Sequence, residues 1–340
     1  MAALEYPHSA PPAKGTALEV APGVHWVRMA LPFALDHINL WLLDEGDGWT
    51  IVDSGLGDEA TRGAWDGVFD GTLGAKPVRR VLVTHYHPDH AGNAAWLCER
   101  TGAQLWMTRS EFLTAHAARG STAGYTTEAQ IDLFTANGLP REQGAQLLTR
   151  GGLYRKMVPG FPIAHRRLHE GEQIDVGARP WRVIVGFGHC PEHASLYCAA
   201  RNVLIAGDML LPRISTNIAV RPVDPWSNPL RLFLDSIARY RDLPAGMLVL
   251  PSHGLPFRGA RERIAELEAH HAARLEELAA ACAAAPRSAA AVLELLFRRK
   301  LDTNQIFFAM GEAIAHLHYL HYAGRLRRTV GADGVARFAP

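Results

Sequence analysis

The sequence Thr84-His85-Tyr86-His87-Pro88-Asp89-His90-Ala91-Gly92 holds four side chains of the metal-binding type within six residues. It follows an apolar run at 78–84 that predicts a buried strand, and it leads into a predicted helix at 91–100. In an extended backbone the first two histidines project to the same side, while the aspartate and the last histidine come where the chain turns. A structural core does not use imidazoles and carboxylates at this density. The stretch therefore predicts a metal site where a strand gives way to a helix.

Three further candidate ligands occupy the same position relative to predicted strands. His189, Asp208 and His253 each follow an apolar run of the strand type. Strands of one sheet tend to present their ends at a common edge, where loops carry function on a rigid scaffold. The five histidines and two carboxylates at such an edge can hold two metal ions, with one carboxylate bridging. This donor set suits Zn²⁺, Fe or Mn, and Zn²⁺ is the default expectation.

Strand and helix patterns divide the rest of the first 258 residues into two strand-rich halves. Strands are predicted at 23–29, 37–43, 49–52, 78–84, 104–108, 181–185, 195–198, 202–206 and 247–250. A helix is predicted at 229–241, and a helical, polar insertion at 109–160 separates the two halves. This order predicts an α+β protein built as a sandwich of sheets flanked by helices.

A change of composition at about residue 259 indicates a second unit. Helices are predicted at 261–285, 288–300 and 303–323, and a hairpin at 325–338 follows them in the order of a winged helix. The expected domains are thus 1–258, with the metal site, and 259–340, which is small and helical. The second domain is expected to serve dimerisation or substrate cover rather than DNA recognition.

The motif HxHxDH with a later His, Asp and His in that order resembles the signature of the metallo-β-lactamase fold superfamily. The upstream Ile51-Val52-Asp53-Ser54-Gly55 fits the first motif of that family, and the resemblance covers about residues 20–258. It implies an αββα sandwich and a dinuclear metal centre. The resemblance assigns two sets of three ligands and one bridge: His85, His87 and His189 for the first ion, Asp89, His90 and His253 for the second, and Asp208 between them.

Within the superfamily, Asp208 and the Asp-His pair of the first motif resemble the glyoxalase II and lactonase branch. Antibiotic-hydrolysing lactamases commonly have a Cys among their metal ligands, so the resemblance argues against lactamase activity. Asp53 is expected to orient a ligand imidazole, although a turn aspartate at a strand end is the plain alternative. Cys190 is expected to point away from the metals, and His193 to lie behind the ligands or at the surface rather than on the substrate.

This metal centre predicts ester-type hydrolysis. Two cations flanking one water lower its pKa to about 7, so a bridging hydroxide can attack a carbonyl carbon that one metal polarises. Asp89 is expected to act as the catalytic carboxylate that accepts the proton and passes it to the leaving group. The first choice of substrate is a small thioester of the acyl-CoA or glutathione type, and a lactone is the second.

The insertion at 109–160 is expected to roof the metal edge, but the sequence does not identify the residues that bind substrate. Apolar side chains of the insertion could line an acyl pocket: Leu113, Tyr125, Ile131, Leu133, Phe134, Leu139 and Leu147. A second set could hold a carboxylate or phosphate, or form a solvated basic loop: Tyr154, Arg155, Lys156, Arg166 and Arg167. Three residues that follow Asp208 are weaker candidates: Arg213, Asn217 and Arg221.

Charge narrows the choice of partners. The 340 residues carry 35 Lys and Arg against 34 Asp and Glu, so a net charge of +1 gives no electrostatic reason to expect a nucleic acid or an anionic membrane. Some superfamily members with helical or winged C-terminal domains act on RNA, which makes an RNA phosphodiesterase the alternative of another class. Residues 259–340 carry eleven Lys and Arg against nine Asp and Glu, a net charge of +2 that argues against this alternative.

The remaining features predict a cytoplasmic protein. No apolar run approaches the roughly 18–20 residues of a spanning helix, and the first fifteen residues lack the pattern of a signal peptide. The four scattered cysteines are typical of reduced thiols: Cys98, Cys190, Cys198 and Cys282.

Overall fold

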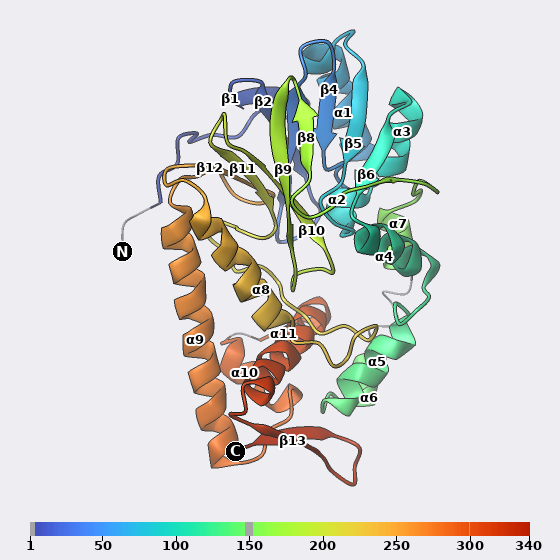
Figure 1. The fold of residues 1–340 in the computed structure, drawn as a ribbon. Helices are drawn as coiled ribbons and strands as arrows, with labels where there is room; N and C mark the ends of the chain where they lie inside the picture. The colour runs from blue at the N-terminus through green and yellow to red at the C-terminus, as the bar shows by residue number, and fades with distance from the viewer. Residues whose placement is uncertain (1–3, 147–151, 299) are drawn as a thin grey trace.

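The computed structural model describes residues 4–146, 152–298 and 300–340, and two stacked β-sheets form the upper half of the view in Figure 1. The seven-stranded sheet has the order β1 (Ala17–Ala21), β2 (Val24–Ala30), β3 (His37–Asp44), β4 (Trp49–Val52), β5 (Val78–Leu82), β6 (Gln104–Met107), β7 (Arg166–Arg167). The five-stranded sheet has the order β12 (Leu248–Pro251), β11 (Val203–Gly207), β10 (His193–Cys198), β9 (Arg179–Gly186), β8 (Gln173–Val176). β1 to β4 pair antiparallel and β4 to β7 parallel, while β11 and β12 form the parallel pair of the second sheet.

The sheets stack because their strands are apolar on both faces. Trp26 of β2 is paired in register with Trp41 of β3, and both are buried in a core that also contains Trp181 of β9. The neighbouring Val27 belongs to a different core, on the opposite face of the sheet. Since successive side chains of a strand point to opposite faces, the first sheet is covered by the second sheet on one side and by helices on the other.

Helices cover both outer faces and complete four layers. On the seven-stranded sheet, Trp65 of α1 (Glu59–Val68) and Leu97 of α3 (Ala94–Thr101) share a core with Val81 of β5. On the five-stranded sheet, Phe233 of α8 (Pro229–Ala238) shares a core with Leu204 of β11. The αββα arrangement predicted from the sequence is confirmed.

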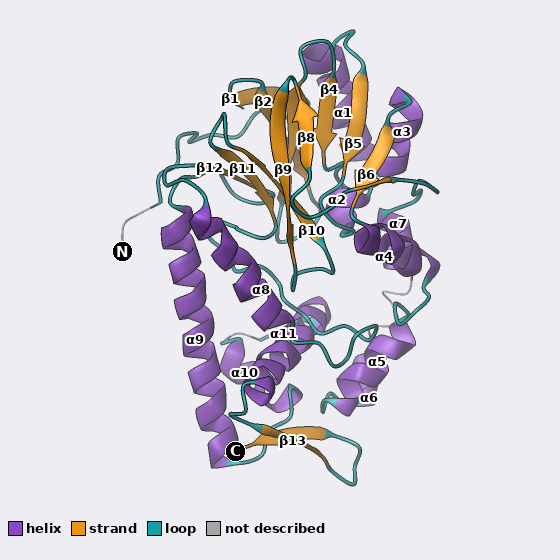
Figure 2. Ribbon diagram, in the orientation of Figure 1, coloured by secondary structure: helices purple, strands orange, loops and turns teal. Residues whose placement is uncertain are grey.

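The remaining helices gather below the sheets, as Figure 2 shows. The insertion forms α4 (Arg109–Gly120), α5 (Thr127–Ala136), α6 (Arg141–Ala145) and α7 (Leu153–Met157). The C-terminal region forms α9 (Ala260–Ala284), α10 (Leu293–Leu296), α11 (Thr303–Tyr322) and a hairpin of β13 (Arg327–Val330) and β14 (Ala336–Ala339). Phe134 of α5 lies in the same core as Leu317 of α11, so the insertion and the C-terminal region pack on each other. No helix in the described residues combines the length and the apolar character needed to cross a lipid bilayer.

Several elements differ from the prediction. β1, α1 and β8 were not predicted, and the expected helix at 91–100 is divided into α2 (Pro88–Ala91) and α3. The division lies at Gly92, where an added Cβ would be 2.3 Å from the backbone nitrogen of Gly57. This close backbone approach requires glycine, which is a packing constraint that helical periodicity does not contain. The expected helix at 288–300 is shortened to a 3₁₀ turn (Ala290–Val292) and α10.

Candidate metal centre

All seven side chains that the sequence predicts as metal ligands lie at one edge of the sandwich. They form two groups, each with ligand atoms within 4.8 Å of one another: His85, His87, His189 and Asp208 in the first group, and Asp89, His90 and His253 in the second group. The edge where the groups lie faces the helical half of the molecule, as the position of α2 in Figure 1 shows.

Asp208 of the first group also faces the second group. Its Oδ2 is 3.3 Å from Nε2 of His189, while its Oδ1 is 3.5 Å from Nε2 of His90 and 3.5 Å from Nε2 of His253. The two oxygens of one carboxylate thus face different groups. This is the geometry that a ligand shared by two cations requires.

Strand ends bring these side chains together. His85 lies just beyond the end of β5, and Asp208 directly follows β11. β11 and β12 are parallel neighbours, so His253, which lies just beyond β12, comes out at the same edge. α2 starts at Pro88, whose fixed φ suits the first helical position, and this short turn carries Asp89 and His90 of the second group.

The donor atoms fit divalent cations. Nε2 of His90 and Oδ1 of Asp208 are buried, and in the described part of the chain neither has a hydrogen-bond partner. Nε2 of His85 is 2.9 Å from Nδ1 of His87 and 3.2 Å from Nε2 of His189. A neutral imidazole has only one N–H, so three converging rings cannot all satisfy one another. A divalent cation bound among these nitrogens and oxygens would supply the missing partner.

The electrostatic environment keeps most of these side chains in the protonation state that binds a metal ion. Burial, reinforced by neighbouring histidines, lowers the pKa of His85 and His87 well below the ordinary value. Burial raises the pKa of Asp208, but the surrounding histidines outweigh it and hold that pKa well below its usual range. For His90, burial lowers the pKa, yet the nearby carboxylates outweigh it and raise the pKa well above its ordinary value. A metal ion must therefore displace a proton from His90, while His85, His87 and Asp208 are already in the binding form.

Asp53 lies directly behind His90. Its Oδ2 is 2.9 Å from Nδ1 of His90, and its Oδ1 accepts the backbone N–H of Thr84 at 2.8 Å. The backbone of Asp53 has φ +64°, a conformation that residues other than glycine rarely adopt and that persists only where the surroundings hold it. The contact turns Nε2 of His90 toward the second group.

Backbone carbonyls orient two more imidazoles. Nδ1 of His253 is 2.7 Å from the carbonyl oxygen of His37, and Nδ1 of His189 is 2.8 Å from that of Asn217. An imidazole that donates its Nδ1–H in this way presents Nε2 as the ligand atom. His193 lies behind the ligands, as expected, because its Nε2 accepts the backbone N–H of Asp208 at 3.2 Å.

The residues that carry this geometry match a known family. Residues 34–253 match the family model described as Metallo-beta-lactamase superfamily. The chain belongs to the metallo-β-lactamase superfamily. Residues 275–340 match a second model, described as Metallo-beta-lactamase-like, C-terminal domain.

Two solved structures of the superfamily are similar along nearly the whole chain. One is a beta-lactamase domain protein from Burkholderia ambifaria, with 50% identity, a TM-score of 0.92, and coverage of 99% of this chain and 98% of that chain. The other is a metallo-beta-lactamase family protein from Thermus thermophilus, with 33% identity, a TM-score of 0.80, and coverage of 94% and 99%. The probable metallo-hydrolase YqjP of Bacillus subtilis (strain 168) is 25% identical over 300 residues, which are 86% of this chain and 91% of that protein. Together with the grouped ligands, these matches identify a metallo-hydrolase of the superfamily.

The apolar residues of the insertion that were proposed to line an acyl pocket lie in different environments, and Tyr125 is near the metal edge, with its ring centroid 6.1 Å from that of Tyr86. Phe134 and Leu139 are buried in the core shared with the C-terminal helices, with Leu133 packed against them, and the side chain of Leu113 is exposed. The spacing of Leu133, Phe134 and Leu139 therefore reflects packing in that core. Leu147 lies outside the described residues.

Of the basic residues proposed to meet substrate, Arg166 is already engaged. Its guanidinium pairs with Glu172 and lies over the ring of Trp106, with 4.2 Å from Cζ to the ring centroid. Arg221, by contrast, takes part in no ion pair within the described residues, and its charge lies close enough to lower the pKa of His87. Arg221 is thus the better placed cation.

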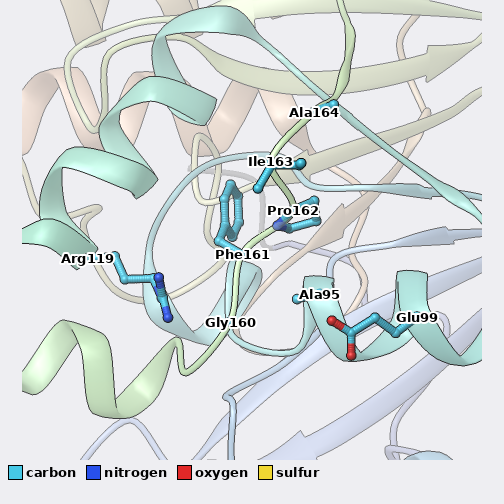
Figure 3. Close-up of a pocket in the computed structure, with 8 residues that line it drawn as sticks. All are labelled: Ala95, Glu99, Arg119, Gly160, Phe161, Pro162, Ile163 and Ala164. Atoms are coloured by element: carbon cyan, nitrogen blue, oxygen red, sulfur yellow. The ribbon is translucent and has the colours of Figure 1, made fainter.

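Figure 3 shows a pocket lined by Ala95, Glu99, Arg119, Gly160, Phe161, Pro162, Ile163 and Ala164. It contains none of the candidate ligands. Nε of Arg119 donates to the carbonyl of Val158 at 3.0 Å, so one wall of this pocket anchors the end of α4.

Glu111 of α4 was not among the residues expected from the sequence. Its side chain is fully buried, and its carboxylate accepts hydrogen bonds from the backbone of Tyr86 and Glu192 and from the thiol of Cys190. Burial raises the pKa of Glu111 to about 6, against the effect of these donors. A polar residue in the first turn of a predicted helix carries no signal that distinguishes it from a surface glutamate.

Proposed function

We propose that this chain is a dinuclear metal-dependent hydrolase that cleaves a thioester of the acyl-CoA or glutathione type, or a related carboxylic ester. The position of Asp208 carries this proposal, because its two oxygens face two separate groups of ligand atoms. The first group, which includes Asp208, would hold one ion, and the second group together with the same Asp208 would hold the other. Zn²⁺ is the expected metal, and Fe and Mn also bind imidazole and carboxylate ligands of this kind.

Two bound divalent ions would supply an acidified water and polarise the substrate carbonyl. The chain's own contribution is to hold a proton acceptor beside that water. Oδ2 of Asp89 lies 3.5 Å from Nε2 of His253 and 3.8 Å from Nε2 of His90, and its side chain is 19% exposed, more than that of Asp208. We assign Asp89 the transfer of the proton from the attacking water to the leaving thiolate or alkoxide. Asp53 would keep His90 oriented during this transfer.

The position of Arg221 is an argument for a substrate that carries a negatively charged group, called the anionic arm below. Its guanidinium is half-buried, and its Cζ lies 5.6 Å from the ring centroid of Phe307. Its charge also reaches Tyr86, the residue between two ligands of the first group, and opposes the effect of burial on the pKa of that hydroxyl. A cation beside an aromatic ring at this edge suits the phosphates or carboxylates of a CoA or glutathione thioester.

The finer assignments belong to the same proposal. We infer a relationship with the glyoxalase II and lactonase branch, a catalytic domain over 1–258 with an insertion at 109–160, and a winged-helix-like domain over 259–340. The packing of α5 against α11 supports a C-terminal domain that covers the substrate side, and a homodimer and a cytoplasmic location stay predictions.

The test is a parallel assay of metal-loaded protein on an acyl-CoA, a glutathione thioester, a lactone and single-stranded RNA. We expect thioester turnover with the highest kcat/KM, its loss after chelation and its return with Zn²⁺, Fe²⁺ or Mn²⁺. Turnover of the lactone in preference would select the second substrate class. Turnover of RNA alone would overturn the ester hydrolase.

A substitution at Arg221 tests the anionic arm. We expect Arg221→Gln to raise KM for an acyl-CoA about tenfold, the effect of one lost charge-assisted hydrogen bond, and to leave KM for an uncharged thioester unchanged. Arg155→Gln is the matched control, because Arg155 is an exposed arginine of α7. Equal effects of Arg221→Gln on both substrates would remove the argument for an anionic arm.

A further inference from the structure

Glu111 joins the two loops that carry the histidines of the first group. Its Oε2 accepts the backbone N–H of Tyr86 at 2.9 Å, and its Oε1 accepts that of Glu192 at 2.6 Å. Tyr86 lies between His85 and His87, and Glu192 lies three residues after His189. One carboxylate therefore spans two segments that are far apart in the chain.

The contact between α4 and the loop of His189 runs in both directions. Oε2 of Glu192 accepts the backbone N–H of Ser110 at 3.0 Å, and the carbonyl of Glu192 accepts the hydroxyl of Thr108 at 2.8 Å. Together with the bond from Glu111, these contacts attach the start of α4 to this loop. A buried carboxylate costs free energy unless hydrogen bonds compensate it, and here the donors come from the ligand loops themselves.

The insertion also holds Tyr86 from its other side. The hydroxyl of Tyr154 on α7 donates to the carbonyl oxygen of Tyr86 at 2.6 Å. Both backbone polar groups of the residue between His85 and His87 are therefore bonded to side chains of the insertion. The far end of α4 is anchored in turn by Arg119, which bonds the carbonyls of Val158 and Pro159 beside the pocket in Figure 3.

We propose that Glu111 is a positioning residue, which holds the loops of His85, His87 and His189 at the spacing that the first ion requires. The inference rests on the metal centre proposed above, but it does not depend on the substrate. It gives the insertion a structural task at the metal centre besides any covering of the substrate.

Glu111→Gln tests this role with nearly unchanged volume. An amide has one acceptor oxygen, so its NH₂ would face one of the two backbone N–H groups, and one of the two attachments would be lost. We expect the first-group ion to bind about 10- to 100-fold more weakly in a Zn²⁺ competition titration, and the second-group ion to bind as in the wild type. With Co²⁺ as the probe, the visible absorption of the first site should change. Glu142→Gln is the control, because Glu142 is an exposed glutamate of the same insertion.

A second variant keeps the test decisive if Glu111→Gln does not fold. Tyr154→Phe removes only the hydroxyl at the other side of Tyr86, and we expect it to weaken the same ion about threefold. Asp53→Asn weakens mainly the second-group ion. When Glu111→Gln or Tyr154→Phe is combined with Asp53→Asn, we expect the binding of the first-group ion to become weaker as well. Folded variants with unchanged affinities and an unchanged Co²⁺ spectrum would overturn the inference. A wild-type protein that binds no divalent ion would instead overturn the proposed function.

Discussion

The first and second groups differ in what holds their imidazoles. In the second group, His90 is bonded to Asp53 at the end of β4, and His253 to the carbonyl of His37 at the start of β3. Both supports belong to the seven-stranded sheet. In the first group, His189 is bonded to Asn217 in the segment after β11, and its loop to Glu111 of the insertion.

The difference shows two ways of building one metal edge. The second group is oriented by a sheet whose strands are buried and paired along their length, so its geometry follows from the fold itself. In the first group, His85 shares the support of Asp53 through Thr84, whose hydroxyl is 3.1 Å from Nδ1 of His85, while His189 is oriented by loops and by added helices. Glu312 of α11 extends this second kind of support, because its side chain hydrogen-bonds Asn217. We expect the second group to tolerate changes in the insertion and the C-terminal region, and the first group to respond to them.

The largest expected effect removes the residue that both groups share. Asp208→Ala should lower kcat about 10³-fold or more and weaken both ions, because the lost transition-state stabilisation is about 4 kcal/mol. Steady-state kinetics together with metal analysis measure both quantities. Asp175→Ala, at an exposed aspartate of β8, is the control. Retention of two tightly bound ions by Asp208→Ala would contradict a bridging ligand.

Asp53→Asn should separate the groups. Loss of the carboxylate behind His90 is expected to weaken the second-group ion about 10- to 100-fold. The first-group ion should weaken less, because Asp53 reaches His85 only through the hydroxyl of Thr84. Stepwise Zn²⁺ titration of the metal-free variant measures this. Equal weakening of both steps would show that the two groups are not supported independently.

Glu312→Gln should act on the first group only, and more weakly. The lost charge-assisted bond to Asn217 lies one residue away from the ligand, so we expect about a two- to fivefold loss of affinity for the first-group ion. Glu294→Gln on α10 is the matched control, because Glu294 is an exposed glutamate of the same region. If Glu312→Gln lowered the affinity for the second-group ion more than that for the first-group ion, the proposed difference in support between the two groups would be wrong.

Acid should destabilise the C-terminal support, where two neighbouring histidines are buried as neutral imidazoles. Nδ1 of His271 lies 3.1 Å from Nε2 of His316, and burial lowers their pKa values to about 3 and about 4. Unfolded histidines take up protons near pH 6.5, whereas these two do not. The free energy of unfolding is therefore complete above pH 6.5 and falls below it, by about 2 kcal/mol per histidine at pH 5.

His316→Gln should flatten this dependence. Urea unfolding of the metal-free variant and wild type at pH 7 and pH 5 gives the difference, in which the contributions of the other histidines cancel. We expect the wild type to lose more stability than the variant over this interval. Parallel losses would show that the buried pair does not respond to acid.

Tertiary contacts explain the mistaken predictions. Phe134 and Leu139 have the apolar spacing of a pocket wall, but the C-terminal helices, more than a hundred residues further along the chain, bury them in a core. The helix at 91–100 satisfies helical periodicity, yet the approach of Gly57 to Gly92 divides it. In both cases the deciding neighbour is distant in sequence.

The amino-acid sequence alone identified the candidate ligand residues and the layers of the fold. Strand periodicity is a local pattern, and His85, His87, Asp89 and His90 lie together in one stretch. The strands and this motif can therefore be recognised from the sequence without the tertiary structure. Only the tertiary structure decided which oxygen of Asp208 faces which group, and that Glu111 is a buried link rather than a surface glutamate. These depend on distances between segments that are far apart in the chain, and burial at such a position changes the chemistry of a side chain that the sequence pattern treats as ordinary.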